Sequence, residues 1–215
     1  MTKKTFAWLA MTVLAIGVAG YALTISSIPE FRPPFARALF EARPITAFTH
    51  FLCGAIALVA GAFQLNAWLR TRYIGAHRWL GRLYVIAVIA GSVAGFLMAL
   101  HAFGGLASYT GFGLLAVLWA GTTLNAYRHI RQRNLIEHRT WMIRSYALTL
   151  AAVTLRLYLT PSLMLGFPMQ IAYPIIAWLC WVPNLLIAEW FVRSRHASAM
   201  LPNDVFAPRA LGGSA

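Results

Sequence analysis

Acidic residues are scarce in this chain, since only 5 Asp and Glu stand against 18 Lys and Arg, and charged residues make up 11% of its 215 positions. The near absence of carboxylates in its apolar segments removes the usual general bases, di-iron ligands and ion-coupling acids. The two cysteines, Cys53 and Cys180, both lie in apolar stretches, which excludes a disulfide framework and a Cys-rich metal site. No H-E-x-x-H, G-x-S-x-G, Walker A or Rossmann fingerprint occurs. Hydrolase, kinase and desaturase functions therefore have little support.

Long hydrophobic runs fill most of the chain, and hydrophobic residues account for 60% of it. A bilayer core about 30 Å thick requires roughly 20 apolar residues per helix. Six such runs predict an all-α integral membrane bundle in one domain over 1–196, with spans at about 6–25, 44–68, 77–101, 104–127, 139–160 and 169–190. The fifth run is irregular, because Arg144 and Arg156 lie within it.

The basic residues gather at alternate ends of these runs. If the N-terminus is inside, only Arg32, Arg37 and Arg43 fall outside, and the inner side collects Lys3, Lys4, Arg70, Arg72, Arg78, Arg82, Arg128, Arg131, Arg133, Arg139, Arg193, Arg195 and Arg209. Inner loops of membrane proteins carry an excess of Lys and Arg. The pattern predicts that both termini are cytoplasmic. It also accounts for most of the net charge of +13, so we expect no nucleic-acid partner.

Two segments lie outside the six runs. The proline-containing stretch Ser26–Arg43 has apolar and charged residues at helical spacing, which predicts a short amphipathic helix at the outer interface, acting as a lid or only as a connector. Residues 197–215 contain prolines and glycines without periodicity, which indicates a disordered cytoplasmic tail.

Four histidines lie at or near the ends of the runs, where an ionisable group needs a partner, a cavity or a cofactor. His77 and His138 open the third and fifth runs at the inner side, whereas His50 and His101 lie toward the outer side. Two histidines on different helices at one depth are the minimum for a six-coordinate haem b. We therefore expect His77 and His138 to ligate an inner haem, and His50 with His101 to form a second, less favoured pair.

Three arginines are candidate partners of the haem propionates. Arg82 and Arg144 follow the inner histidines in two similar stretches, and Arg156 lies at the depth of the outer pair. Arginines near a helix N-terminus oppose the helix dipole, so a negative group should compensate them. Propionates, lipid phosphates or a phosphorylated substrate would all do so.

The same residues have simpler explanations, which the sequence leaves open. His77 and His138 can cap helices and contact lipid phosphate, and Arg144 can pair with Glu189. Glycines recur along one face of several spans. A flat ring such as haem bound between helices would require such faces, but the same faces also allow helices to pack closely. Glycine and proline interruptions in the fourth and sixth runs keep a small-solute transporter conceivable.

The stretches HRWLGRLY (77–84) and HRTWMIRSYALTLAAVTLRLYL (138–159) carry a resemblance. Together with His50, the run from Gly61 to Gln64 and Trp119, they resemble domain-of-unknown-function family 2306, over about Thr46 to Glu189. The resemblance implies a multi-pass protein of the bacterial inner membrane and no established activity. The chain is more loosely similar to membrane cytochromes of the b561 type, whose four-helix core carries two histidine pairs. The fourth span of this chain has no internal histidine.

The sequence thus predicts a b-type haem protein that transfers electrons within the membrane, with the bilayer, a quinone or a membrane redox partner, and a second copy of the chain as candidate partners. A non-catalytic module that binds lipid or supports a partner complex is the alternative from another class.

Overall fold

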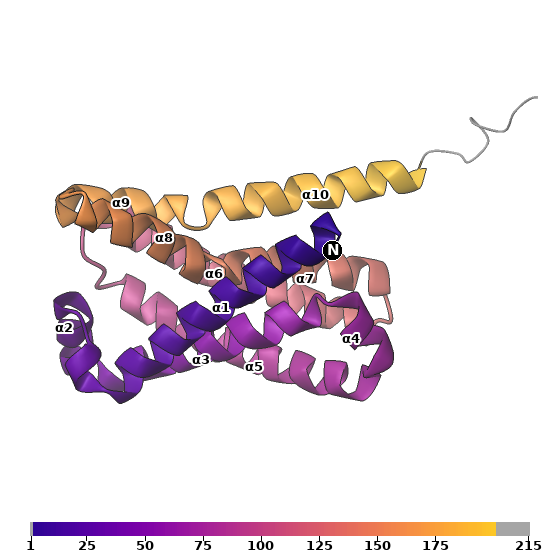
Figure 1. The fold of residues 1–215 in the computed structure, drawn as a ribbon, viewed down its shortest axis with the longest axis horizontal. Helices are drawn as coiled ribbons and strands as arrows, with labels where there is room; N and C mark the ends of the chain where they lie inside the picture. The colour runs from indigo at the N-terminus through magenta and orange to yellow at the C-terminus, as the bar shows by residue number, and fades with distance from the viewer. Residues whose placement is uncertain (1, 201–215) are drawn as a thin grey trace, which may run out of the picture.

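The computed structural model describes residues 2–200, and every regular element in this range is a helix (Figure 1). The elements in chain order are α1 (Lys3–Ser27), η1 (Pro29–Phe31), α2 (Pro34–Ala42), α3 (Pro44–Gln64), α4 (Ala67–Arg72), α5 (Ile74–Ala99), α6 (Leu106–Arg131), α7 (Leu135–Thr149), α8 (Ala151–Met164), α9 (Met169–Leu179) and α10 (Val182–Met200). The predicted tail begins inside α10, and its residues 201–215 lie outside the described range.

Five helical segments are long and apolar enough to cross a membrane, with mean hydropathies from 1.3 to 1.9: Thr5–Ser27, Pro44–Gln64, Ile74–Ala99, Leu135–Met164 and Met169–Ser194. The multi-pass α-helical fold is therefore confirmed. Helix α6 has 26 residues but is not among these segments, since serine, threonine, tyrosine and asparagine dilute its apolar residues. The sixth span remains a prediction.

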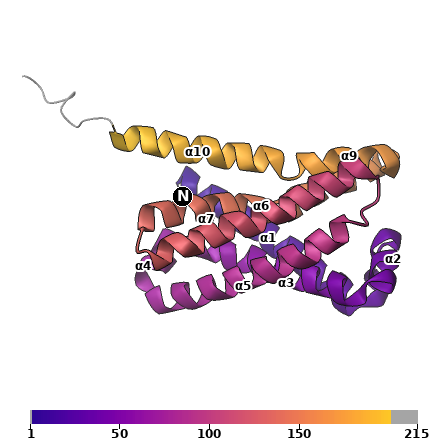
Figure 2. The ribbon, with the colours of Figure 1, turned by 180° about the vertical axis from the view of Figure 1, so that it is seen from behind.

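The long helices run roughly side by side and define two ends of the bundle (Figures 1 and 2). Helix α2 lies at one end, the α2 end, and α4 lies at the other, the α4 end, where α1 also begins and α10 finishes. Helix α3 packs between α1 and α5, and α6 packs between α5 and α7. Since α3 also contacts α7, the helices α5 and α7 face each other across a four-helix core.

The second predicted span ends earlier than expected. Helix α3 stops at Gln64, because the side chain of Asn66 accepts a hydrogen bond from the backbone of Leu69 and starts the short helix α4. Trp68, assigned to the span from the sequence, belongs to α4 and is exposed. The turn brings α4 and its arginines back against α5.

The fifth and sixth spans are each broken near their middle, at Leu150 between α7 and α8 and at Cys180 between α9 and α10. Side chains satisfy backbone carbonyls at these breaks. The amide of Asn184 donates to the carbonyls of Ala147 (3.3 Å) and Cys180 (3.1 Å), and the Thr154 hydroxyl donates to Cys180 as well. Such internal partners are what allow an irregular backbone at membrane depth.

Candidate functional site

His138 lies in the first turn of α7, which begins after Asn134 caps the helix by accepting from the backbone of Glu137. The half-buried imidazole approaches α6, where its Nδ1 is 2.9 Å from the carbonyl oxygen of Ala126. A carbonyl only accepts, so Nδ1 carries the proton and the Nε2 of the neutral ring keeps a lone pair. This is the arrangement by which second-shell bonds orient metal-binding histidines.

His77 lies in the first turn of α5 and is also half-buried. Its carbonyl accepts a 2.6 Å hydrogen bond from Nε2 of Gln64, which ties the end of α3 to the start of α5. The two histidines predicted as an inner pair thus lie in the first turns of helices that face each other across the core.

A cavity of about 180 Å³ adjoins His77 at the α4 end and is lined by Phe63, Gln64, Leu69, Arg70, Tyr73, Ala76, His77 and Leu80. Arg70 is the charged residue of this lining, and the sequence predicted only that it lies on the inner side of the membrane. Burial lowers the pKa of the Arg70 guanidinium, and the neighbouring Arg139 lowers this pKa further. Asn66 is the sequence signal that could have indicated the position of Arg70. It is a helix-capping residue three positions before Leu69 and predicts the short helix that carries Arg70.

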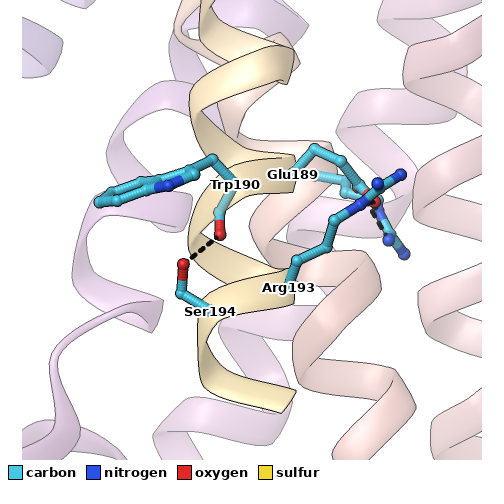
Figure 3. Close-up of polar contacts among 5 residues, drawn as sticks. Glu189, Trp190, Arg193 and Ser194 are labelled. Carbon is cyan, nitrogen blue, oxygen red and sulfur yellow. Dashed lines mark hydrogen bonds and ion pairs between the residues drawn. The ribbon is translucent and has the colours of Figure 1, made fainter. Parts of the chain in front are cut away.

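The other two inner residues named from the sequence lie elsewhere. Arg82 is exposed, and Arg144 forms an ion pair with Glu189 of α10, its Nη2 lying 2.9 Å from Oε2. Arg193 binds the second carboxylate oxygen of Glu189 at 3.0 Å. Figure 3 shows Glu189 and Arg193 on one side of α10 and Trp190 on the other. The structure therefore realises the alternative in which Arg144 pairs with Glu189.

At the α2 end, His50 and His101 have different partners. The Nδ1 of His50 is 2.9 Å from the carbonyl oxygen of Gly91, and the His50 ring packs against Gly95. His101 follows Gly95 by six residues and lies just past the end of α5 at Ala99. Its Nε2 accepts from Nη2 of Arg43 at 2.6 Å, and its side chain is exposed. The structure does not bring these two imidazoles together, so we do not assign them a shared iron.

Arg156 lies in the middle of α8, and its guanidinium stands over the ring of Tyr21 at 5.3 Å. Its Nη1 donates to the carbonyl of Ala152 at 2.7 Å, whereas its Nε is enclosed and has no hydrogen-bond partner. That Arg156 is a propionate partner at the depth of His50 stays a prediction.

A buried polar cluster that the sequence reasoning missed separates the two ends. The Tyr84 hydroxyl lies 2.7 Å from Ser145 Oγ and 2.8 Å from Thr149 Oγ1, and Trp119 donates to Thr149 at 2.8 Å. Thr123 reaches Ser145 at 2.7 Å. No local signal in the sequence identified the partners of Ser145 and Thr149. The cluster joins α5, α6 and α7.

Metal sites with three or more His, Cys, Asp or Glu ligands do not occur within residues 2–200.

These features define a multi-pass membrane protein with histidines and arginines at both ends of an α-helical core. The chain belongs to the family described as predicted membrane protein, DUF2306, whose model matches residues 47–192. No curated protein and no solved structure matches the chain.

Proposed function

We propose that the α4 end of the core binds haem b between His77 and His138, and that the protein transfers electrons within the membrane. The observation that supports this most is the pair itself, two half-buried imidazoles in the first turns of α5 and α7, which face each other across the core. The bond from His138 to Ala126 leaves Nε2 available to a metal. Haem, when bound, would supply one-electron chemistry that no side chain of this core provides.

The donor set fits haem b, because two neutral histidines are suitable axial ligands and Arg70 offers positive charge for a propionate. The space fits less well. The cavity of about 180 Å³ is smaller than the roughly 300–1,000 Å³ typical of cofactor pockets. To admit haem, the surrounding chain would have to open at α4, whose six residues include no buried side chain.

The proposal is tested by the visible spectrum of the detergent-purified protein, expressed with an ample supply of haem. We expect a b-type Soret band and α band in the reduced-minus-oxidised spectrum. Both bands should be lost or shifted in His77→Ala and in His138→Ala, because each change removes an axial ligand. The control His101→Ala should keep them, since its side chain is exposed at the α2 end. A colourless wild-type protein, or bands that survive both changes, would contradict the proposal.

A second candidate function, binding of an anionic phospholipid at the same end, is favoured by the cavity. Its walls are mostly apolar, and the polar residues that line it are Gln64, Arg70, Tyr73 and His77, with no carboxylate among them. A phosphate headgroup would compensate the positive charge, and an acyl chain would lie along the apolar wall.

Thermal unfolding with added phosphatidylglycerol tests this second candidate. A lipid present at about 100 times its Kd should stabilise the wild-type protein by roughly 2.7 kcal/mol. Arg70→Gln should lose most of this stabilisation, whereas Arg72→Gln, an exposed position on the same helix, should retain it. Equal responses from the two variants would refute a specific lipid site at the cavity.

The proposal also includes the topology. We place α6 across the membrane as a sixth span, because it is as long as α5 and packs between α5 and α7. The arginines of α4 and of the last turn of α6 favour a cytoplasmic α4 end in a bacterial inner membrane. Both termini would then be cytoplasmic, since α1 begins and α10 ends there (Figure 1).

A further inference from the structure

A second cavity, of about 380 Å³, lies at the α2 end, where the end of α1, the segment before α2 and the start of α3 meet (Figure 1). Its volume falls within the range of roughly 300–1,000 Å³ that is typical of small-molecule sites. Arg32 is its charged lining residue, and no carboxylate of the described chain lines it. The polar lining also includes Ser26 and Thr49, and the apolar lining includes Phe40, Ile45 and Phe48.

Internal contacts hold the Arg32 guanidinium in one position at this cavity. Its Nε donates to the carbonyl of Ile25 at 2.8 Å and its Nη2 to that of Ser26 at 3.0 Å, so the side chain is tied to the last turn of α1. The guanidinium carbon also lies 4.1 Å from the centroid of the Phe40 ring, and that ring stacks on Phe51. Because the cation is already ordered, a ligand loses little affinity to the immobilisation of this side chain.

Arg32 retains both charge and hydrogen-bonding capacity. Its two bonds go to neutral carbonyls, which leave the positive charge uncompensated, and a guanidinium has further N–H donors besides these. No carboxylate among the described side chains forms an ion pair with Arg32. The Thr49 hydroxyl of α3 likewise has no hydrogen-bond partner in the described range. The cavity therefore presents a fixed cation and a free hydroxyl, which an anion with several oxygens would satisfy.

The apolar lining indicates that this anion carries a hydrocarbon chain. Ile45 and Phe48, in the first turns of α3, are 81% and 46% exposed. Leu52 continues the same face of the helix one turn further along the span. A small inorganic anion would contact none of this face, whereas a chain attached to the anion would lie along it.

We propose that the cavity at the α2 end binds an anionic phospholipid, with the phosphate at Arg32 and Thr49 and an acyl chain along Ile45 and Phe48. Charge complementarity favours this occupant, because arginine forms strong charge-assisted bonds with phosphate and basic pockets between membrane helices bind lipid headgroups. The site is separate from both proposals for the α4 end. In the proposed topology it takes its lipid from the outer leaflet.

Native mass spectrometry of the detergent-purified full chain, titrated with phosphatidylglycerol, tests the site. The parent protein is Arg70→Gln, so that the basic charge of the α4 cavity does not contribute. We expect one saturable binding event that weakens about tenfold or more when Arg32→Gln is added, since this change removes the charge. Arg37→Gln is the matched control and should bind like the parent, because Arg37 is exposed on α2 and does not line the cavity. Equal affinities with and without Arg32→Gln would overturn the proposal.

Two substitutions of Ile45 keep the test decisive if Arg32→Gln does not fold. Ile45 is 81% exposed, so Ile45→Glu adds a carboxylate beside the cavity without disturbing the packing of α3. Ile45→Gln has nearly the same shape without the charge. Phosphatidylglycerol should bind Ile45→Glu about tenfold more weakly than Ile45→Gln, and equal binding would contradict an anion at Arg32.

Two further compounds, added to the parent protein, identify the part of the lipid that is recognised. Glycerol phosphate has no acyl chain, and phosphatidylcholine carries a cation beside its phosphate. Both should bind about tenfold more weakly than phosphatidylglycerol. Glycerol phosphate that binds as tightly as the lipid would replace the proposal with a free-phosphate site, and phosphatidylcholine that binds equally well would reduce the cavity to an apolar groove.

Discussion

Replacing Gly61 with alanine is expected to lower the free energy of unfolding by about 1–3 kcal/mol, the usual cost of overpacking a close-packed core. A Cβ at this position would lie 2.3 Å from two carbons of the Tyr146 ring. That ring cannot easily withdraw, because the Tyr146 hydroxyl donates to the carbonyl of Leu58 at 3.1 Å. Reversible unfolding in mixed micelles measures the change.

The control lies on the same helix. Gly54 has no atom within 4 Å of an added Cβ, so Gly54→Ala should stabilise α3 by up to about 1 kcal/mol through helix propensity alone. The two substitutions are chemically identical and should therefore have opposite signs. If both stabilise the protein, Tyr146 does not pack against α3 as described.

Replacing Thr149 with valine is expected to cost about 1–3 kcal/mol, because it leaves a buried donor without an acceptor. The Thr149 hydroxyl donates to the carbonyl of Ser145 at 3.0 Å and accepts from Trp119 and Tyr84. Valine has nearly the same shape and removes all three bonds. The indole N–H of Trp119 would then face hydrocarbon. Loss of stability should accompany a change in tryptophan fluorescence.

Thr110→Val serves as the comparison for this second substitution. The Thr110 hydroxyl is exposed and bonds only to carbonyls of its own helix, at 2.8 Å and 3.2 Å. Its removal orphans no donor, so the change in stability should stay within about 0.5 kcal/mol. Similar losses at both positions would mean that the buried cluster contributes little.

The cluster around Tyr84 also lies between the two ends of the core. Tyr84 lies seven residues from His77 and seven from Gly91, or about 10 Å along α5 in each direction. A satisfied network of this kind favours one arrangement of the helices around it. The cluster is therefore a buried polar layer between the α4 end and the α2 end of the core.

Whether a prediction for a single residue agreed with the structure depended on whether its physical cause lay within one segment of the sequence or in the packing between helices. The inner histidines were correctly placed at one end of the bundle, because both open a span. The outer pair stays a prediction, and depth counted along the sequence did not reveal that His50 lies opposite Gly91 while His101 lies near Arg43. Arg144 had two open partners in the sequence, and the packing of α10 against α7 selected Glu189.

Composition and run length were enough to establish a helical, multi-pass membrane protein, because each helix in lipid must satisfy its own backbone and expose apolar side chains. These requirements act within a single segment. The partners of Arg70, His50 and Thr149 were decided only by tertiary structure. They depend on the offset and rotation of one helix against another, and those are set by side chains distant in the sequence, such as Tyr146 against Gly61.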